Sequence, residues 1–175
     1  MSGTNRRWQR WDPNKEAWFE IDNTKDVCVS GDVILYVNNN SEDAVITFSG
    51  AVKDLSAKPE YTIYGEGCAQ FIAYPWPVAI KVSDVASYII DGTLKAAAQF
   101  DGCDQIWRYD AVGDKWVKYA YHRVNGTTRT WQKYIPADGT WANLDDEKDV
   151  IGPGEGFLFV NNDSNDKTFK FTYAK

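Results

Sequence analysis

The chain has 175 residues, of which 43% are hydrophobic and 15% aromatic, so it is not generally disordered and suits one globular domain or two small ones. The formal net charge of −6 argues against nucleic acid as a partner, because binding to phosphate backbones depends on clustered cations. The sequence has no apolar run long enough for a transmembrane helix, and its first residues lack the apolar stretch of a signal peptide.

The first part of the chain, residues 6–52, alternates apolar and polar residues in short segments separated by turn residues. This period of two is typical of β-strands, whose successive side chains point to opposite faces of a sheet. The pattern predicts strands near 7–12, 17–21, 32–38 and 44–49.

The middle part, residues 53–128, contains two strand-like segments, EYTIYGEGCAQFIAYPW and CDQIWRYDAVGDKWVKYAYHRV. Between them, VSDVASYIIDGTLKAAAQF is the one segment that suits a short helix. Ser83 or Asp84 would cap its start, and Asp91-Gly92 would end it.

The last part, residues 129–175, predicts strands near 130–135, 140–144, 155–160 and 167–173. Asp138-Gly139 suits the first hairpin turn, because this pair tolerates the positive φ angles that such turns need. Residues 161–166 supply the last turn.

The last part repeats the first. Residues 6–52 align without a gap on residues 129–175, with 18 identities in 47 positions, which indicates duplication. The repeated elements include GDVILYVNNNSED at 31–43 and GEGFLFVNNDSND at 154–166, interpreted as equivalent closing hairpins. We therefore expect a complete β unit at 53–175, preceded by a half unit at 6–52 whose opening half is missing. We expect the two to pack as one compact body.

These features predict an all-β fold: an antiparallel, hairpin-rich sandwich or barrel-like unit with a duplicated half and at most one short helix. A half unit leaves open sheet edges, which invite pairing with further strands. Such pairing can occur within the chain or between copies of it.

The complete unit resembles a tandem repeat of large, mostly uncharacterised bacterial surface and secreted proteins. Three short motifs carry the resemblance: Ala73-Tyr74-Pro75-Trp76, Asp104-Gln105-Ile106-Trp107 and Pro153-Gly154-Glu155-Gly156-Phe157. The resemblance implies an all-β module with an adhesive or scaffolding role, and it brings no catalytic residues. The small size of the chain and the lack of a recognisable leader depart from the usual setting of that repeat.

No catalytic constellation stands out. The only histidine, His122, lies next to Arg123 and far from any recognisable nucleophile motif, so an ordinary strand histidine is the better interpretation. Asp145, Asp146, Glu147 and Asp149 could supply a pair of catalytic carboxylates. Their counterparts at 22–26 keep only two charges, which favours loop capping by Asx turns. We expect no enzyme activity and no cofactor.

The sequence gives only weak indications of a metal site or a disulfide. NNNSED and NNDSND offer several oxygen ligands, yet neither matches an EF-hand loop, so turns are favoured over calcium sites. Cys28, Cys68 and Cys103 are widely spaced. A bridge between Cys68 and Cys103 is one alternative, and buried free thiols are the favoured one.

Aromatic residues are the main candidates for a binding surface, because flat rings can stack on sugars. Core and interface positions are nevertheless favoured, since cross-strand aromatic pairs also stabilise sheets. The candidates occur in three hairpins and are Trp8, Trp11, Trp18, Trp131, Tyr134, Trp141, Trp107 and Trp116.

The leading hypothesis is a non-enzymatic, self-assembling structural protein, a subunit of a filament, fibre or particle surface. Strands near 7–12 and 167–173 are the predicted contacts between subunits. The alternative is a carbohydrate-binding or adhesive module, with Trp18 and Trp141 as equivalent platform residues. An extracellular, cell-surface or virion location is favoured over the cytoplasm.

Overall fold

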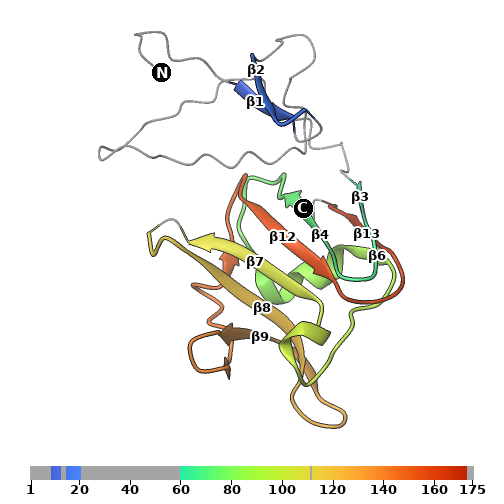
Figure 1. Cartoon of the computed structure of the whole chain (residues 1–175). Coiled ribbons are helices and arrows are strands. Elements are labelled where there is room, and N and C mark those ends of the chain that lie inside the picture. The colour runs from blue at the N-terminus through green and yellow to red at the C-terminus, as the bar shows by residue number, and fades with distance from the viewer. Residues whose placement is uncertain (1–8, 13–14, 21–59, 111, 173–175) are drawn as a thin grey trace. The chain divides into compact units, whose positions relative to one another are not determined.

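The computed structural model describes residues 9–12, 15–20, 60–110 and 112–172, and the chain divides into two units at Ser30 (Figure 1). In the first unit, strands β1 (Gln9–Asp12) and β2 (Ala17–Glu20) form an antiparallel hairpin. The rest of the expected half unit, including the strands near 32–38 and 44–49, lies outside the described residues.

The first hairpin has the same register as a hairpin of the second unit. Trp11 lies opposite Trp18 in β1–β2, and Tyr134 lies opposite Trp141 in β9 (Arg129–Ile135) and β10 (Thr140–Ala142). These residues are counterparts in the duplicated sequence, so the two hairpins agree with the duplication in their pairing as well as in their composition.

The second unit is built on a six-stranded antiparallel sheet, in the order β10-β9-β8-β7-β12-β4 (Figure 1). Four further strands complete it: β8 (Lys115–Arg123), β7 (Gln105–Asp110), β12 (Gly156–Asn161) and β4 (Cys68–Ala73). The hairpin turn between β9 and β10 has Gly139 at a φ of 68°, as predicted for Asp138-Gly139.

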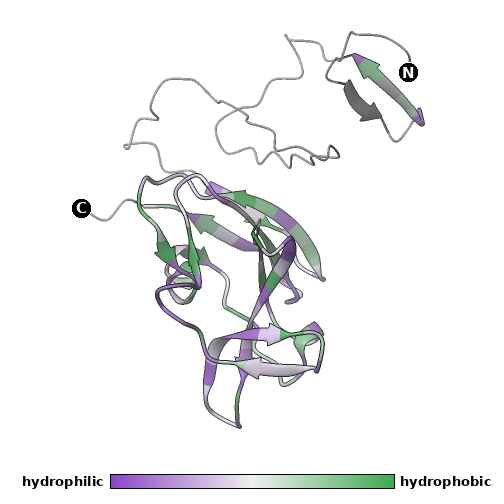
Figure 2. Cartoon of the chain, turned by 90° about the vertical axis from the view of Figure 1, so that its left-hand side faces the viewer, coloured by the Kyte–Doolittle hydropathy of each residue, from purple (hydrophilic) through white to green (hydrophobic). Residues whose placement is uncertain are grey.

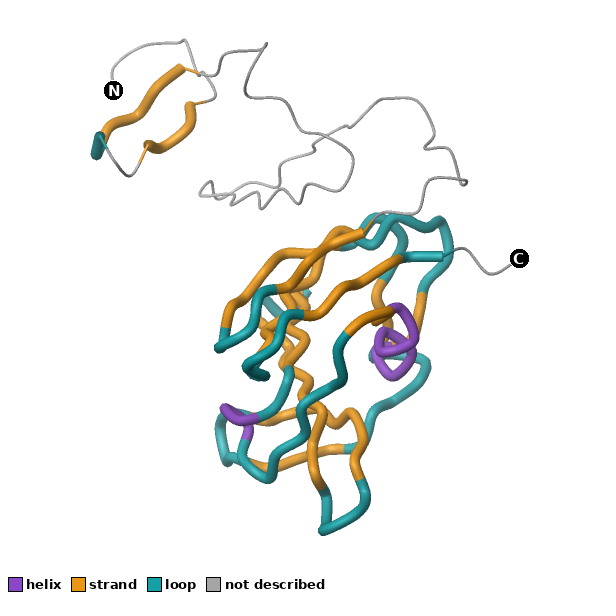
Figure 3. The backbone as a smooth tube through the Cα atoms, turned by 90° about the vertical axis from the view of Figure 1, so that its right-hand side faces the viewer, coloured by secondary structure: helices purple, strands orange, loops and turns teal. Residues whose placement is uncertain are grey.

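A second group of short elements consists mainly of a three-stranded sheet, β3-β13-β6, formed by Glu60–Ile63, Lys167–Lys170 and Ile89–Asp91. The two-residue strands β5 (Ile80–Lys81) and β11 (Val150–Ile151) pair beside it. The 3-10 helix η1 spans Val82–Tyr88, and η2 is a single turn at Phe100–Gly102 (Figure 3). Within the described ranges, no helix is long and apolar enough to cross a membrane.

The hydrophobic core combines side chains from both groups of elements. Hydrophobic and hydrophilic residues alternate along the strands, as Figure 2 shows for the second unit. In β12 the alternation is strict, since Phe157 and Phe159 are buried while Leu158 is half-buried. The six-stranded sheet and the smaller elements contribute Ile72, Ile106, Val117, Tyr119, Trp131, Phe157, Phe159, Ile63, Val82, Val85, Ile151, Phe169 and Phe171.

The predicted all-β, antiparallel fold is therefore confirmed, with one short helix of more than a single turn, and no sheet in the described part closes into a barrel. The strands expected from period-two alternation in the last part of the chain agree with β9, β10, β12 and β13 to within a few residues. Alternation succeeds here because each strand buries one face only.

Two local predictions are wrong. Residues 161–166 do not close a hairpin, because β12 pairs with β4 and β7 whereas β13 pairs with β3 and β6. The chain instead turns a corner from one sheet to the other. Helix η1 begins after Lys81 without a side-chain cap, and Asp91-Gly92 ends strand β6 rather than the helix.

Gly65 is the point at which the β3–β4 connection meets this corner. The glycine is buried, and its N–H donates to Asp166 Oδ1 over 3.0 Å. A Cβ atom at this position would lie 2.8 Å from the backbone of Ser164, closer than van der Waals contact allows. Only a residue without a side chain fits here unless one backbone segment moves.

We expect Gly65→Ala to lower the free energy of unfolding by about 2 kcal/mol, as overpacking against rigid backbone does. Urea denaturation of the full chain measures this change. Gly126→Ala is the matched control, because nothing lies within 4 Å of a Cβ at that position. Equal unfolding midpoints for the two variants would contradict the close approach at Gly65.

Candidate functional site

One row of side chains crosses all six strands of the large sheet. Directly paired residues lie on the same face of a sheet, so the register places the whole row on the face opposite the core. This cross-strand row consists of Phe71, Leu158, Trp107, Lys118, Tyr134 and Trp141.

Three rings gather where the row ends at β4. Trp116 lies 6.4 Å from Phe71 and 5.4 Å from Tyr109 between ring centroids, with the Tyr109 ring nearly perpendicular. Phe71 is 47% exposed and Tyr109 is 37% exposed, whereas Trp116 is half-buried. We call these three residues the outer aromatic patch, and it is the apolar part of this face that water reaches most.

Other rings of the row have one face covered by a side chain of the protein itself. The Lys118 ammonium lies 3.9 Å from the centre of a Trp107 ring. Phe100 stacks on Tyr134 at 4.3 Å, and His122 stacks on Trp141 at 3.9 Å. These cation–π and stacking contacts leave less flat surface for a sugar than the sequence suggests.

Residues 95–103 hold Phe100 in this position. Gln105 Nε2 donates to the Phe100 carbonyl over 3.0 Å, and the Trp107 indole N–H donates to Gln105 Oε1 over 2.8 Å. The buried Cys103 thiol donates to the carbonyl groups of Ala97 and Gln99. This loop thus covers Tyr134 on β9 and lies close to Trp141 on β10.

The predicted aromatic candidates separate into two groups. Trp131 is buried in the core, where its ring centroid lies 5.7 Å from that of Tyr121. Trp107, Trp116, Tyr134 and Trp141 lie half-buried on the outer face. Trp11 and Trp18 pair in β1–β2, and Trp8 lies outside the described residues. The outer face also contains Phe71, Phe100 and Lys118, which the repeated hairpin pattern did not single out.

A buried ion pair joins the two sheets behind this face. Lys167 on β13 lies 3.0 Å from the carboxylate of Asp104, which precedes β7, and the two side chains are 1% and 0% exposed. The Lys167 ammonium also donates to Asn161 Oδ1 at the end of β12. Burying two charges is favourable only when both are paired and hydrogen-bonded, as they are here.

Two backbone N–H groups complete the environment of Asp104. Lys95 N–H donates to Oδ2 over 2.7 Å, and Asn162 N–H donates to Oδ1 over 2.9 Å. Burial raises the pKa of Asp104 and outweighs the opposing effect of these groups and of Lys167. The carboxyl group therefore takes up a proton more readily than an exposed aspartate does.

The two asparagines of the corner satisfy backbone groups. Asn161 Nδ2 donates to the carbonyls of Asn165 over 2.8 Å and Ile63 over 3.2 Å, and Asn162 Nδ2 donates to the Cys103 carbonyl. Asn161 thus closes the turn, and its side-chain oxygen is already hydrogen-bonded. In the duplicated sequence, their counterparts are again asparagines, whereas the counterpart of Lys167 is Ala44.

A second polar cluster surrounds Asp149. Tyr119 donates its hydroxyl over 2.9 Å and Lys133 its ammonium over 3.1 Å to Oδ1, while Asp145 N–H donates to Oδ2. Burial acts to raise the pKa of Asp149, but these hydrogen bonds outweigh it, so the net pKa is lowered. Asp145 in turn accepts the N–H of Glu147, as the predicted Asx turn requires.

The remaining candidates for chemistry are structural. His122 Nδ1 lies 2.5 Å from Gln132 Oε1 on the neighbouring strand, as expected for a strand histidine. Within the described ranges, no group of three His, Cys, Asp or Glu residues is arranged to hold a metal ion. Cys68 and Cys103 are free thiols, but Cys68 is exposed rather than buried, and Cys28 lies outside the described residues.

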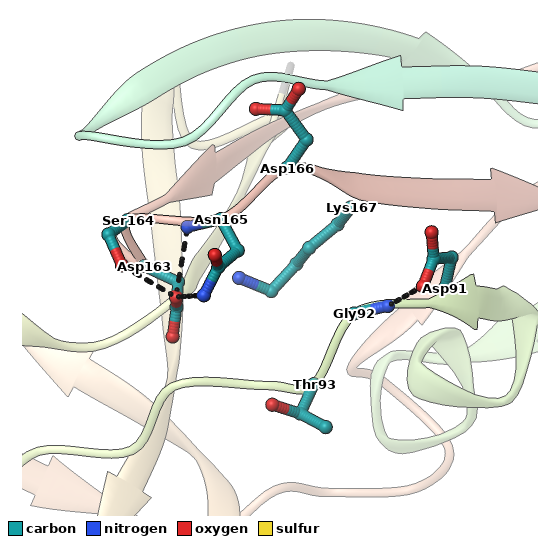
Figure 4. Close-up of a pocket in the computed structure, with 8 residues that line it drawn as sticks. All are labelled: Asp91, Gly92, Thr93, Asp163, Ser164, Asn165, Asp166 and Lys167. Atoms are coloured by element: carbon teal, nitrogen blue, oxygen red, sulfur yellow. Dashed lines mark hydrogen bonds between the residues drawn. The ribbon is translucent and has the colours of Figure 1, made fainter.

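A polar pocket opens beside the corner, lined by residues 91–93 and 163–167 (Figure 4). Its three carboxylates each accept a backbone N–H: Asp91 from Gly92, Asp163 from Asn165, and Asp166 from Gly65. Figure 4 shows the Lys167 side chain running between the corner and Gly92. The stem of this lysine forms one wall, since a Cβ at Gly92 would lie 2.9 Å from Lys167 Cγ.

The alternation of residues along β13 indicates a buried lysine, which the sequence motifs do not. Lys167, Phe169 and Phe171 share one face of the strand, so the two phenylalanines indicate that the lysine points inward. Its partner Asp104 lies far away in the sequence and could not be identified from this pattern.

Comparisons with known protein families, curated protein sequences and solved structures found no match for this chain.

We expect Lys167→Met to lower the free energy of unfolding by about 4 kcal/mol, because it leaves a buried carboxylate without its cation. Lys170→Met is the matched control on the same strand. Lys170 pairs with Glu60 at the surface, and losing an exposed pair changes stability by less than about 1 kcal/mol. Urea denaturation measures both, and equal losses would contradict the role given to the buried pair.

We also expect Asp149→Asn to lower stability by about 2 kcal/mol at pH 7, because a charged acceptor is lost. The lowered pKa of Asp149 means that its stabilisation is present above the unfolded-state pKa of about 3.9 and is lost as pH falls further. The difference in the free energy of unfolding between wild type and Asp149→Asn should therefore shrink as the pH is lowered from about 5 to about 2. Urea denaturation at several pH values tests this, and a constant difference would contradict it.

Proposed function

We propose that this protein is a non-enzymatic structural module that associates with a second copy of itself through the edge strand β4. The observation that carries the proposal is the composition of this edge. β4 has six residues, CAQFIA, without a charge or a proline. Edge strands usually carry charges, prolines or bulges that prevent pairing, or they are very short.

The opposite edge of the same sheet is protected by its length, since β10 has only three residues. β4 faces β12 on one side, and among the described strands it has no partner on the other. Tyr74, one residue after β4, donates its N–H to Glu155. By the alternation of antiparallel ladders, Ala69 and Phe71 then direct their backbone groups away from β12.

Antiparallel pairing of two β4 strands would use the same surface on both subunits, as a two-fold contact requires. It would join the two large sheets into one and place the Phe71 rings of both copies on the outer face. The cross-strand row would then continue from one subunit into the next, which removes the exposed edge of Phe71 from water.

This contact replaces one that the sequence suggested. β13 lies between β3 and β6, so both of its backbone sides are occupied over residues 167–170, which disfavours this part of the predicted subunit contact at 167–173. Strand β1 keeps its place among the predicted contacts. A two-fold contact by itself closes a dimer, and a filament, fibre or particle surface requires a second contact.

The carbohydrate-binding alternative receives less support. Lys118, Phe100 and His122 each cover a ring face that a sugar would need. The outer aromatic patch is the remaining platform, and its Tyr109 and Trp116 rings are tilted by 65° from one another. A sugar ring that stacks on one of them would not lie flat on the other.

We expect the wild-type protein to sediment as a dimer or a larger species in sedimentation velocity at about 100 μM. Phe71→Lys should raise the dissociation constant at least tenfold, which corresponds to about 1.4 kcal/mol. The added charge would have to be buried at the contact. Val112→Lys is the matched control, because Val112 is 99% exposed in the β7–β8 turn.

Circular dichroism should be the same for both variants and the wild type. A monomeric wild type at this concentration would overturn the proposal, as would equal weakening by both substitutions. Binding to a glycan array that is lost in Trp116→Ala, with the protein monomeric throughout, would favour the carbohydrate-binding alternative.

A further inference from the structure

Three groups of complementary chemistry meet inside the protein: an amine, a carboxamide and a carboxyl group. They belong to Lys167, Asn161 and Asp104, whose side chains are all at most 1% exposed. The rings of Phe159 and Phe169 pack 4.8 Å apart on the same two strands. Because the three side chains are buried, water is kept away from groups that it would otherwise separate.

We propose that Lys167 and Asn161 form an intramolecular amide bond, and that Asp104 relays the protons of this reaction. The Lys167 ammonium donates to Asn161 Oδ1, so the nucleophile lies against the carboxamide that it would attack. Asp104 Oδ2 lies 3.0 Å from Lys167 Nζ, within reach of the proton that must leave first.

Burial favours this first proton transfer. An ammonium and a carboxylate in an apolar interior can exchange a proton to become an amine and a carboxylic acid, which removes both charges. Burial raises the pKa of Asp104 in agreement with that direction. The neutral amine then carries the lone pair needed to attack Asn161 Cγ.

The corner supplies the other groups that the reaction needs. Asp163 N–H lies 3.1 Å from Asn161 Oδ1, where negative charge develops in the tetrahedral intermediate, and can stabilise it as an oxyanion-hole donor does. Asn161 Nδ2 is held by the carbonyls of Asn165 and Ile63, so the leaving nitrogen points away from Lys167.

The atoms balance without an oxidant or a co-reactant. The bond between Nζ and Cγ forms, and the bond between Cγ and Nδ2 breaks. The carboxamide nitrogen leaves as ammonia with one of the two protons that Nζ gives up. Asp104 keeps the other proton and ends as a neutral carboxylic acid, so no unpaired charge is left in the interior. The polar pocket beside the corner is the exit for ammonia.

The duplicated sequence provides an internal comparison. Asn38 and Asn39 repeat Asn161 and Asn162, but Ala44 stands where Lys167 stands in the second copy. Both copies thus keep the asparagines, whereas the amine occurs only in the copy that follows Asp104 in the chain. A lysine that serves the turn alone would have no reason to follow this distribution.

Mass spectrometry of tryptic peptides from the purified full chain tests the proposal. Trypsin cannot cleave after Lys167 once its amine is an amide, so residues 149–170 should appear as one peptide. This peptide should be lighter than its sequence by about 17 Da, the mass of ammonia. Cleavage after Lys167 with an unchanged mass would overturn the proposal, and this result requires no variant to fold.

Three controls separate the bond from other losses of ammonia and test the role of Asp104. Asparagine can also lose ammonia as a succinimide, which hydroxylamine opens to a hydroxamate, whereas an amide to lysine resists hydroxylamine. A product that reacts with hydroxylamine would overturn the proposal. Lys170→Met should keep the loss of ammonia and Lys167→Met should abolish it. Asp104→Asn should abolish the loss while leaving both bonding residues in place, and an undiminished loss in this variant would overturn the role of Asp104.

Discussion

The ion pair between Asp104 and Lys167 is the interaction on which the second unit depends, because it connects the two sheets inside the core. A buried charge is tolerated only where its partner and the remaining hydrogen bonds are in place. The remaining bonds come from the N–H groups of Lys95 and Asn162, which donate to Asp104, and from Asn161, which accepts from Lys167. The position of β13 relative to β7 and β12 is thus fixed by polar geometry as well as by packing.

Local and long-range demands meet at the corner. Asn161 satisfies the Asn165 carbonyl within the corner and the Ile63 carbonyl on β3, whereas Asn162 satisfies the Cys103 carbonyl, which lies far away in the sequence. Lys167 answers a carboxylate that is also distant in the sequence, that of Asp104. Both copies of the duplicated sequence keep the two asparagines, whereas Ala44 stands where Lys167 stands, so the lysine belongs only to the copy that follows Asp104 in the chain.

The strands could be predicted from the sequence because alternation is a local property, and each strand of the large sheet buries one face. The corner could not, since the turn residues at 161–166 suit a hairpin as well as a change of sheet. What decides between them is the pairing of β13 with β3, about a hundred residues earlier in the chain, together with the buried Asp104. The aromatic residues could likewise be identified as candidates, but alternation did not show that Phe100, from residues 95–103, covers one of them.

Strand β4 is the part of the outer face where aromatic side chains are least covered by the described residues. Aromatic residues on an exposed sheet face are costly in water unless they cover one another, and Lys118, Phe100 and His122 provide this cover at Trp107, Tyr134 and Trp141. The row ends at Phe71, where no residue of the described chain continues it and the exposed fraction rises to 47%. Among the described residues, backbone pairing and ring burial are therefore both incomplete at the same strand, which is why the proposed association places a second β4 strand there.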